Sequence, residues 1–379
     1  MTILPRRSCP SQSTKLPGAL KAQSLAARPR RWVTALLAAA LLVAGCTPPS
    51  GPAAEQSPAA AFPGEWRQVY FTDPDSPTAS SYRGGPDQAL ADAVDQARLS
   101  VDLAVMDLNL WNLRDALIAA HNRGVAVRLV VDSDYLDEDE IQEIKAAGIP
   151  VLGDRREGLM HNKFTVIDRL DVWTGSLNYT ISDAYRNNNN MLRIRSARLA
   201  ESYTAEFEEM FVDDRFGPGS PANTPHREVA VEDAHVEVYF SPDDGVAERL
   251  VDLVQGAQDS VYFLAYSFTL DELAEALVER SQAGVRVAGV MEARQVASNT
   301  GSDYERFLAA GLDVRLDGNP NNMHHKVLII DEQVVVTGSY NFSLNAETRN
   351  DENSLVIFDP EVADLYLEEF RRVFAAGQD

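Results

Sequence analysis

The chain has 379 residues, of which 45% are hydrophobic and 24% are charged, a composition that excludes a disordered chain, a collagen and a coiled coil. Seven of its 34 basic residues lie in the first 45 positions, which contain no acidic residue. The other 27 basic residues face all 57 acidic ones, so positions 46–379 carry a net charge of −30. This charge disfavours a broad surface that binds polyanions.

The N-terminus has the pattern of a secretion signal. Arginines at positions 28, 30 and 31 precede an apolar run from 32 to 44. At about 13 residues, this run is too short to cross a bilayer but suits the core of a signal peptide. It ends in Val-Ala-Gly-Cys, which resembles the lipobox of bacterial lipoproteins. We therefore expect residues 1–45 to be a signal peptide and Cys46 to carry the lipid.

Residues 46–64 are rich in Pro and Ala, which is typical of an extended tether. We predict that the protein is lipid-anchored in the bacterial cell envelope, at the outer membrane if the organism is Gram-negative. The alternative is that it is secreted. The chain beyond Cys46 has no cysteine, which excludes disulfides, thiol catalysis and zinc–thiolate sites there.

The rest of the chain is a duplication. Val-Tyr-Phe occurs at 69–71 and again at 238–240, and buried strands are predicted at 100–106 and 260–266. Each strand is followed by a helical pattern, a glycine and another strand, as in a β-α-β unit. We predict an α/β fold of two half-domains with mixed sheets flanked by helices, related by a pseudo-twofold axis. The predicted boundaries are 65–216 for the first half, 217–234 for a Pro-containing linker and 235–379 for the second half.

Each half carries the pattern His-x-Lys-x-x-x-x-Asp. By chance, one such pattern is expected on the order of 0.01 times in this chain, so two in register are not accidental. A histidine and a lysine two positions apart on a strand project from the same face and can meet one phosphate. The predicted catalytic residues are His161, Lys163, Asp168, His324, Lys326 and Asp331.

A Thr-Gly-Ser-x-Asn segment follows each pattern. Its serine and asparagine offer hydroxyl and amide donors for further phosphate oxygens. The predicted phosphate-binding and orienting residues from these segments are Ser176, Asn178, Ser339 and Asn341. The distribution of lysine supports this interpretation. Of the three lysines beyond Cys46, two lie in the His-x-Lys patterns and only Lys145 lies outside them.

These paired patterns closely resemble the phospholipase D superfamily over both halves of the folded chain. The resemblance implies a phosphodiesterase without metal or other cofactor, in which one motif histidine attacks phosphorus and the other protonates the leaving alcohol. The lysines would hold the phosphate oxygens. Asp168 and Asp331, although part of the motif, are expected to orient loops and neighbouring side chains rather than to transfer protons.

A further position distinguishes the halves, because Asn189 and Glu352 each lie 28 residues after their motif histidine. In many members of the superfamily an acid here hydrogen-bonds the catalytic histidine, fixing its tautomer. Aligning the halves assigns Glu352 to His324 and leaves His161 without a carboxylate. The expectation is therefore that His324 is the nucleophile and His161 the acid.

The remaining histidines have simpler interpretations. His325 follows His324 on a strand and so points to the opposite face, where packing or solvation is expected. His121, His226 and His235 are expected at the surface. The acidic run 137–140 suits the solvated start of a helix rather than a metal site.

The substrate is less determined than the chemistry. The predicted anchor and the negative charge favour phospholipid, whose headgroup ester would be hydrolysed near a membrane. A nuclease and a phosphatidyl transferase of the same superfamily remain alternatives, and a catalytically silent binding protein is a third class. No oligomer is required, because both motifs lie in one chain.

Overall fold

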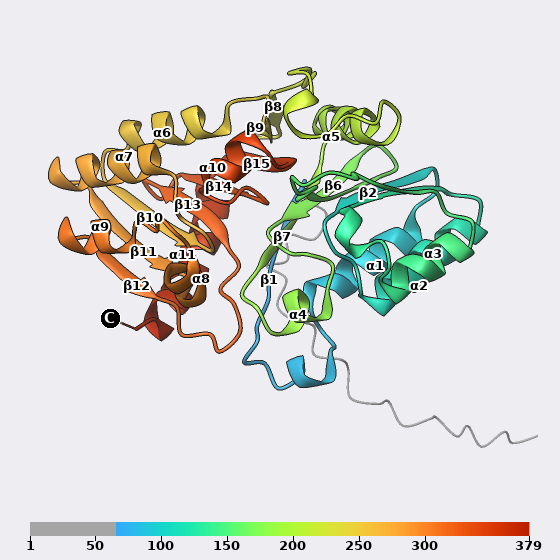
Figure 1. Cartoon of the computed structure of the whole chain (residues 1–379), viewed down its shortest axis with the longest axis horizontal. Coiled ribbons are helices and arrows are strands. Elements are labelled where there is room, and N and C mark those ends of the chain that lie inside the picture. Colours follow the sequence, from blue (N-terminus) through green and yellow to red (C-terminus); the bar gives the residue numbers. More distant parts are fainter. Residues whose placement is uncertain (1–65, 379) are drawn as a thin grey trace, which may run out of the picture. The chain divides into compact units, whose positions relative to one another are not determined.

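A computed structural model describes residues 66–378, which belong to one compact unit (Figure 1). The predicted signal peptide, the predicted lipidation site Cys46 and the predicted tether lie outside the described residues. Within the described part, no helix combines the length and the apolar character needed to cross a membrane. The described chain forms two mixed β-sheets with helices packed on them, which confirms the predicted fold class.

The first sheet has the strand order β1-β7-β6-β5-β2-β3-β4. Strands β2, β3 and β4 are parallel, whereas the remaining neighbours are antiparallel. The strands are β1 (Arg67–Phe71), β2 (Ser100–Val105), β3 (Ala126–Val131), β4 (Val151–Gly153), β5 (Lys163–Ile167), β6 (Asp171–Gly175) and β7 (Asn190–Arg195). The helices of this half are α1 (Pro86–Gln96), α2 (Trp111–Asn122), α3 (Asp139–Ala146), α4 (Ile181–Tyr185) and α5 (Ala197–Phe211).

The second sheet repeats this order as β12-β11-β10-β13-β14-β15-β9 and adds β8 at its edge. Its strands are β8 (Glu228–Val231), β9 (Ala234–Ser241), β10 (Ser260–Ala265), β11 (Arg286–Met291), β12 (Asp313–Leu316), β13 (Lys326–Ile330), β14 (Val334–Gly338) and β15 (Glu352–Phe358). Its helices are α6 (Val246–Gly256), α7 (Asp271–Gln282), α8 (Ala293–Ser298), α9 (Tyr304–Ala309), α10 (Leu344–Thr348) and α11 (Pro360–Ala376). Strand β8 lies in the segment predicted as a linker and pairs with β9 as a hairpin.

The two sheets share one hydrophobic core. Alternate residues of a strand face opposite sides, so on β5 Phe164 and Val166 enter the shared core while Ile167 joins the outer core of the first half. Helices α5 and α11 supply the rest of the shared core, and each begins at a capping side chain, Ser196 or Asp359, that accepts backbone N–H groups. This core holds the two halves together beside the motif strands.

The aspartate that closes each motif begins the three-residue connection of a hairpin, 168–170 between β5 and β6 and 331–333 between β13 and β14. Asp168 and Asp331 both have φ above 50°, a conformation that Asp and Asn adopt more readily than other residues with a side chain. The Asp331 carboxylate accepts the backbone N–H groups of Gln258, Asp259 and Ser260, and Asp168 does the same for residues 98–100. The motif aspartates thus bind a neighbouring loop to the far end of the motif strands.

Replacing Asp331 with Ala should lower the free energy of unfolding by about 1 to 3 kcal/mol, because three N–H groups lose a charged acceptor. Asp331→Asn should lose less, since an amide oxygen still accepts and asparagine tolerates the turn conformation. Urea denaturation measures both changes, with Glu275→Ala on the exposed face of α7 as the control. Equal stability of the Ala variant and the wild type would contradict this role.

Candidate active site

The two motif histidines are each anchored to the opposite half of the chain. The backbone N–H of His161 donates to the backbone carbonyl of Asp351 at 2.9 Å, and the backbone N–H of His324 donates to that of Asn188, also at 2.9 Å. Asp351 and Asn188 lie just before β15 and β7, which are equivalent strands of the two halves. The junction between the halves therefore fixes both histidines, which are only 5% and 6% exposed.

The motif lysines begin strands β5 and β13 and are 1% exposed. Lys163 Nζ donates to the carbonyl of His161 at 2.8 Å, and Lys326 Nζ donates to that of His324 at 2.7 Å. Burial lowers the pKa of Lys163 to about 8, against the opposing effect of Glu352. Burial, followed by repulsion from Lys163, holds the pKa of Lys326 well below its usual range. An anion between these lysines would relieve both costs.

His161 has the carboxylate partner. Its Nδ1 lies 2.6 Å from Glu352 Oε2, and Glu352 is fully buried. Burial raises the Glu352 pKa, but His161 and Lys163 outweigh it and hold the pKa below the usual range. Burial is also the main cause that lowers the His161 pKa, and Glu352 opposes it. The prediction that Glu352 serves His324 was wrong, because the start of β15 lies against the first half's motif rather than its own.

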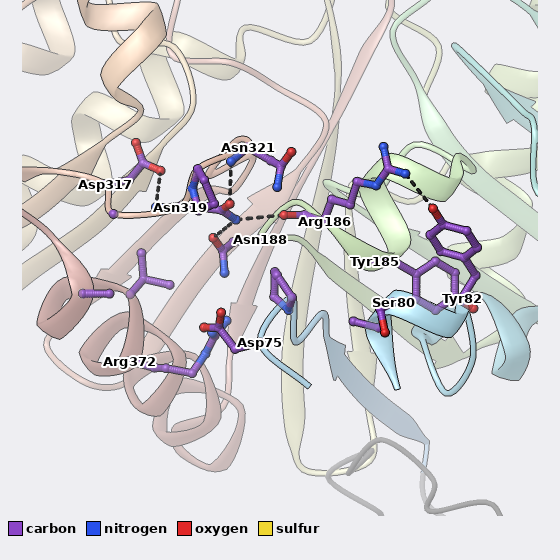
Figure 2. Close-up of a pocket in the computed structure, with 16 residues that line it drawn as sticks. Asp75, Ser80, Tyr82, Tyr185, Arg186, Asn188, Asp317, Asn319, Asn321 and Arg372 are labelled. Atoms are coloured by element: carbon purple, nitrogen blue, oxygen red, sulfur yellow. Dashed lines mark hydrogen bonds between the residues drawn. The ribbon is translucent and has the colours of Figure 1, made fainter. Parts of the chain in front are cut away.

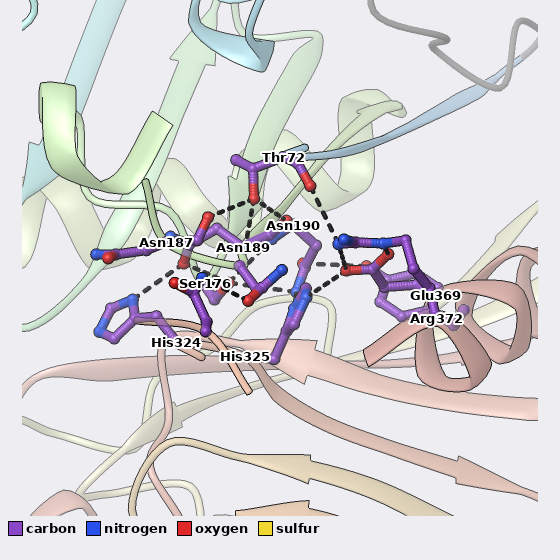
Figure 3. A network of polar contacts seen from close by, with 12 residues as sticks. Thr72, Ser176, Asn187, Asn189, Asn190, His324, His325, Glu369 and Arg372 are labelled. Carbon is purple, nitrogen blue, oxygen red and sulfur yellow. Dashed lines mark hydrogen bonds and ion pairs between the residues drawn. The ribbon is translucent and has the colours of Figure 1, made fainter. Parts of the chain in front are cut away.

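His324 instead meets a neutral amide. Its Nδ1 lies 3.0 Å from Asn189 Oδ1 (Figure 3). The Asp183 carboxylate is farther from the same nitrogen, at 3.6 Å. The Tyr266 ring packs edge-on against the imidazole, with 4.6 Å between ring centroids, and also lies under the Lys326 ammonium. Burial, then Lys326, Lys163 and His161, lower the His324 pKa well below its usual value.

The two serines orient the histidine partners. Ser176 Oγ donates to Asn189 Oδ1 at 2.9 Å, and Ser339 Oγ donates to Glu352 Oε2 at 2.8 Å. The glycine before each serine makes this approach possible, because a Cβ at Gly175 would lie 2.4 Å from the carbonyl oxygen of Asn190. Both serines are fully buried, and their hydroxyls are used within the protein. Of the two predicted serine roles, the structure therefore supports orientation rather than contact with phosphate.

The two asparagines of these segments are less constrained. The side-chain oxygens of Asn178 and Asn341 are buried and have no hydrogen-bond partner among the described residues. Asn178 contributes its backbone N–H to the Asp183 carboxylate at 2.9 Å. These oxygens can accept from a donor of a ligand, whereas the Nδ2 group of the same amide is the one that can donate to a phosphate oxygen.

The structure separates the motif aspartates from the histidines. Asp168 and Asp331 follow the far ends of β5 and β13, where their carboxylates hold the loops described above. Their inclusion in the predicted catalytic set is therefore corrected, and the expected loop-orienting role accounts for all of their observed contacts. The physical reason is the strand itself, which separates Lys163 from Asp168 by five residues at about 3.3 Å each.

His325 faces away from His324 and is fully buried rather than solvated. Its Nε2 lies 2.9 Å from Glu369, which also pairs with Arg372, and its Nδ1 lies 3.0 Å from the Asn190 amide (Figure 3). Asn190 in turn contacts Ser176, so this buried network ends at the partner of His324. Two of the histidines expected at the surface have partners there, His226 with Glu201 and His235 with Glu237.

The two junctions between the halves differ next to the histidines. At one, Asn319 Nδ2 donates to Asn188 Oδ1 at 2.7 Å and to the Arg186 carbonyl at 3.0 Å, beside a pocket of about 500 Å³ (Figure 2). At the equivalent place on the other junction, the Arg156 guanidinium contacts the Asp351 carboxylate. One junction is thus filled by an ion pair, whereas the other leaves a pocket.

Sequence reasoning missed Asp183, Tyr266 and Asp107. Burial, with Glu138 and Asp183 nearby, raises the Asp107 pKa to about 7, and Lys163 opposes this rise. The signal in the sequence was the difference between copies, since Ala346 is the equivalent of Asp183 and Met106 that of Tyr266. Among residues 66–378, no group of three or more His, Cys, Asp or Glu side chains is arranged to hold a metal ion.

Comparisons with a family profile and with individual proteins indicate the same family. The profile described as "Cardiolipin synthase, PLD-like domain" matches residues 90–211 and 250–374. A phospholipase D of Rickettsia prowazekii is 33% identical over 135 residues, which are 36% of this chain and 65% of that protein. The human mitochondrial cardiolipin hydrolase is 34% identical over 156 residues, 41% of this chain and 55% of that protein. The chain therefore spans less than two thirds of the length of these two relatives.

The fold extends to a more distant solved structure. The phosphatidylserine synthase of Haemophilus influenzae aligns with a TM-score of 0.58 over 77% of this chain and 87% of that one. The sequence identity is 14%, so this likeness concerns the fold alone.

The lowered pKa of His324 predicts a pH-dependent stability. Its usual value is 6.5, so below this pH the unfolded chain takes up a proton that the folded chain does not, and stability present above pH 6.5 is lost as the pH falls. Between pH 7.5 and 5.5, the free energy of unfolding of His324→Asn should therefore fall by about 1 kcal/mol less than that of the wild type. Urea denaturation at both values measures this, with His121→Asn as the control. Identical losses in His324→Asn and the wild type would contradict it.

Proposed function

The chain belongs to the phospholipase D-like family, whose profile matches both of its motif copies, and we propose that it is a phosphodiesterase acting through a phosphohistidine. The single observation that carries the proposal is the reciprocal arrangement of the motifs, in which each histidine is held by the opposite half through a backbone and a side-chain hydrogen bond. Such an arrangement suits two different roles for two chemically similar side chains.

His161 is the proposed nucleophile. Its lowered pKa favours the neutral imidazole, and Glu352 at Nδ1 holds the proton there, so that Nε2 carries the lone pair. Nε2 forms a bond to phosphorus while the bond from phosphorus to the leaving oxygen breaks. The Glu352 carboxylate then offsets the positive charge of the phosphorylated ring.

His324 is the proposed acid and base. It gives a proton to the leaving oxygen in the first step, and in the second it accepts a proton from the water that attacks phosphorus and breaks the bond to His161. Lys163 and Lys326 offset the charge on the non-bridging oxygens, whose negative charge in turn raises the pKa of His324. Asn178 and Asn341 are the proposed amide donors to these oxygens.

Phospholipid is the proposed substrate class. The named activities of the relatives, phospholipase D and cardiolipin hydrolase, support it. The net charge of −30 beyond residue 45 supports it as well, because it opposes the approach of nucleic acid. An anchor at Cys46, which is proposed from the sequence, would hold the site near headgroups in the bacterial envelope.

Purified residues 47–379 should hydrolyse phosphatidylcholine, phosphatidylethanolamine or cardiolipin in mixed micelles, and excess chelator should leave the rate unchanged. Release of headgroup and phosphatidic acid measures the activity. Single-stranded and double-stranded DNA serve as the competing substrates. Cleavage of DNA alone would overturn the lipid proposal, and loss of all activity with chelator would overturn catalysis by side chains alone.

His161→Asn and His324→Asn should each reduce turnover by at least about a hundredfold, because neither role can be filled by the other histidine. In wild type quenched during turnover with ³²P-labelled substrate, the label should map to the peptide that contains His161. The surface variant His121→Asn should retain full activity. Label on His324 would reverse the proposed roles.

Cys46→Ser in the full chain should abolish incorporation of radioactive palmitate and release the protein from the membrane fraction of an expressing bacterium. Unchanged labelling and fractionation would contradict the lipid anchor. Catalytic activity on micelles should not change, which separates anchoring from chemistry.

A further inference from the structure

The short helices α4 and α10 are equivalent in the two halves but differ at one buried position. Helix α4 carries Asp183, which is 4% exposed, and helix α10 carries Ala346 at the same place. The Asp183 carboxylate accepts the backbone N–H of Asn178 at 2.9 Å and the side-chain amide of Asn187. A buried carboxylate present in only one copy points to a task that only one copy performs.

Asp183 supplies the negative charge that the direct hydrogen-bond partner of His324, Asn189, does not have. Asn189 accepts a hydrogen bond from Nδ1 whether the ring is neutral or charged, so as a neutral amide it stabilises the imidazolium less than a carboxylate does. The carboxylate of Asp183, 3.6 Å from the same nitrogen, favours the charged ring through its field. Glu352 gives His161 both a hydrogen bond and a negative charge. For His324, Asn189 gives the hydrogen bond and Asp183 gives the negative charge.

We propose that Asp183 is a positioning residue that keeps His324 protonated, once a substrate phosphate is bound beside it, until its proton passes to the leaving oxygen. This inference rests on the proposed phosphodiester cleavage and assigns the source of the acid's charge. The direct contact at His161, 2.6 Å, suits a ring that stays positively charged once phosphorylated. The longer contact at His324 suits a ring that must give up a proton and regain it in each cycle.

Other charged groups face His324 and set the background against which Asp183 acts. Two lysines, His161 and His325 oppose protonation of His324, and the Tyr266 ring covers one side. Glu352 favours the charged form of both lysines, and Asp107 favours that of Lys163. The groups are Lys326 on β13, Lys163 on β5, His161 before β5, His325 on the opposite face, Glu352 on β15, and Asp107 and Tyr266 after β2 and β10. Cations prevail in this set, so loss of one nearby carboxylate should be measurable.

The step that Asp183 supports is proton transfer to the leaving group. As the bond between His161 and phosphorus forms, the bond to the leaving oxygen breaks, and the proton of His324 moves to that oxygen. An alkoxide needs this proton, whereas 4-nitrophenolate departs without it. The effect of Asp183 should therefore depend on the leaving group, which a merely structural role would not produce.

The experiment compares wild type and Asp183→Asn on two phosphodiesters, one with a primary alcohol and one with 4-nitrophenol as the leaving group. For the alcohol, we expect kcat, which reports groups in the enzyme–substrate complex, to fall at least about tenfold at pH 8 and its alkaline limb to move down by about 1 to 3 pH units. The limb moves down because the acid form of His324 is lost at lower pH. For 4-nitrophenol, the rate should stay within about threefold.

A second pair of variants separates charge from structure. Asp183→Asn combined with Asn187→Asp restores the net charge and the pair of carboxylate and amide between α4 and the turn after it. It moves the carboxylate to the residue that Asp183 contacts, so the defect should persist. Asp183→Asn combined with Asn189→Asp places the carboxylate at Nδ1, as in the other half, and should return the alkaline limb at least halfway to its wild-type position. Both the limb and the ratio of the two substrates are independent of the fraction of folded enzyme.

An unchanged limb and equal losses on both substrates would overturn the role of Asp183 while leaving phosphodiester cleavage intact. Restoration by the Asn187→Asp exchange would also overturn it, because the position of the charge would then not matter. If wild type cleaves neither substrate under any condition, the proposed function fails instead, so the two failures are distinguishable.

Discussion

Two pairs of hydrogen bonds hold the motif histidines across the junction between the halves, and the rest of the site depends on them. The residues that begin β15 hold His161 by backbone and carboxylate, and those that precede β7 hold His324 by backbone and amide. The shared core of α5, α11 and both sheets keeps these strand ends together. Because the lysines donate to the carbonyls of the same histidines, four groups that can carry positive charge are confined in a buried space, which favours an anionic ligand.

The two copies use the same framework with different chemistry. The framework consists of the close approach at Gly175 and Gly338, the buried serines and the hairpin turns at Asp168 and Asp331. The differences lie around the histidine rings, where one copy offers Glu352 and the other offers Asn189 with Asp183 behind it. Symmetry in the backbone with asymmetry in the charges is the physical basis for the proposed division of labour between nucleophile and acid.

The sequence predicted the duplication, the mixed sheets and the motif residues, because those features are local patterns with fixed periods. It did not predict which copy supplies each histidine partner. An alignment of the two halves compares a residue with its equivalent, whereas Glu352 reaches the other half's His161, a contact that depends on how the halves pack. Asp183 was missed for a related reason, since a single acid in a five-residue helix carries no motif of its own. The loop-orienting role of Asp168 and Asp331 was expected, but the turn conformation that directs their carboxylates to those loops is not revealed by spacing.

Reciprocal anchoring also limits how each copy can evolve. A substitution at Glu352 alters the environment of His161 in the other copy before it alters its own, and a change at Asn189 is felt at His324. Neither repeat can therefore change at these positions without altering the surroundings of the other repeat's histidine. For the same reason a single repeat cut out of this chain would keep its motif but lose the residues that orient its own imidazole.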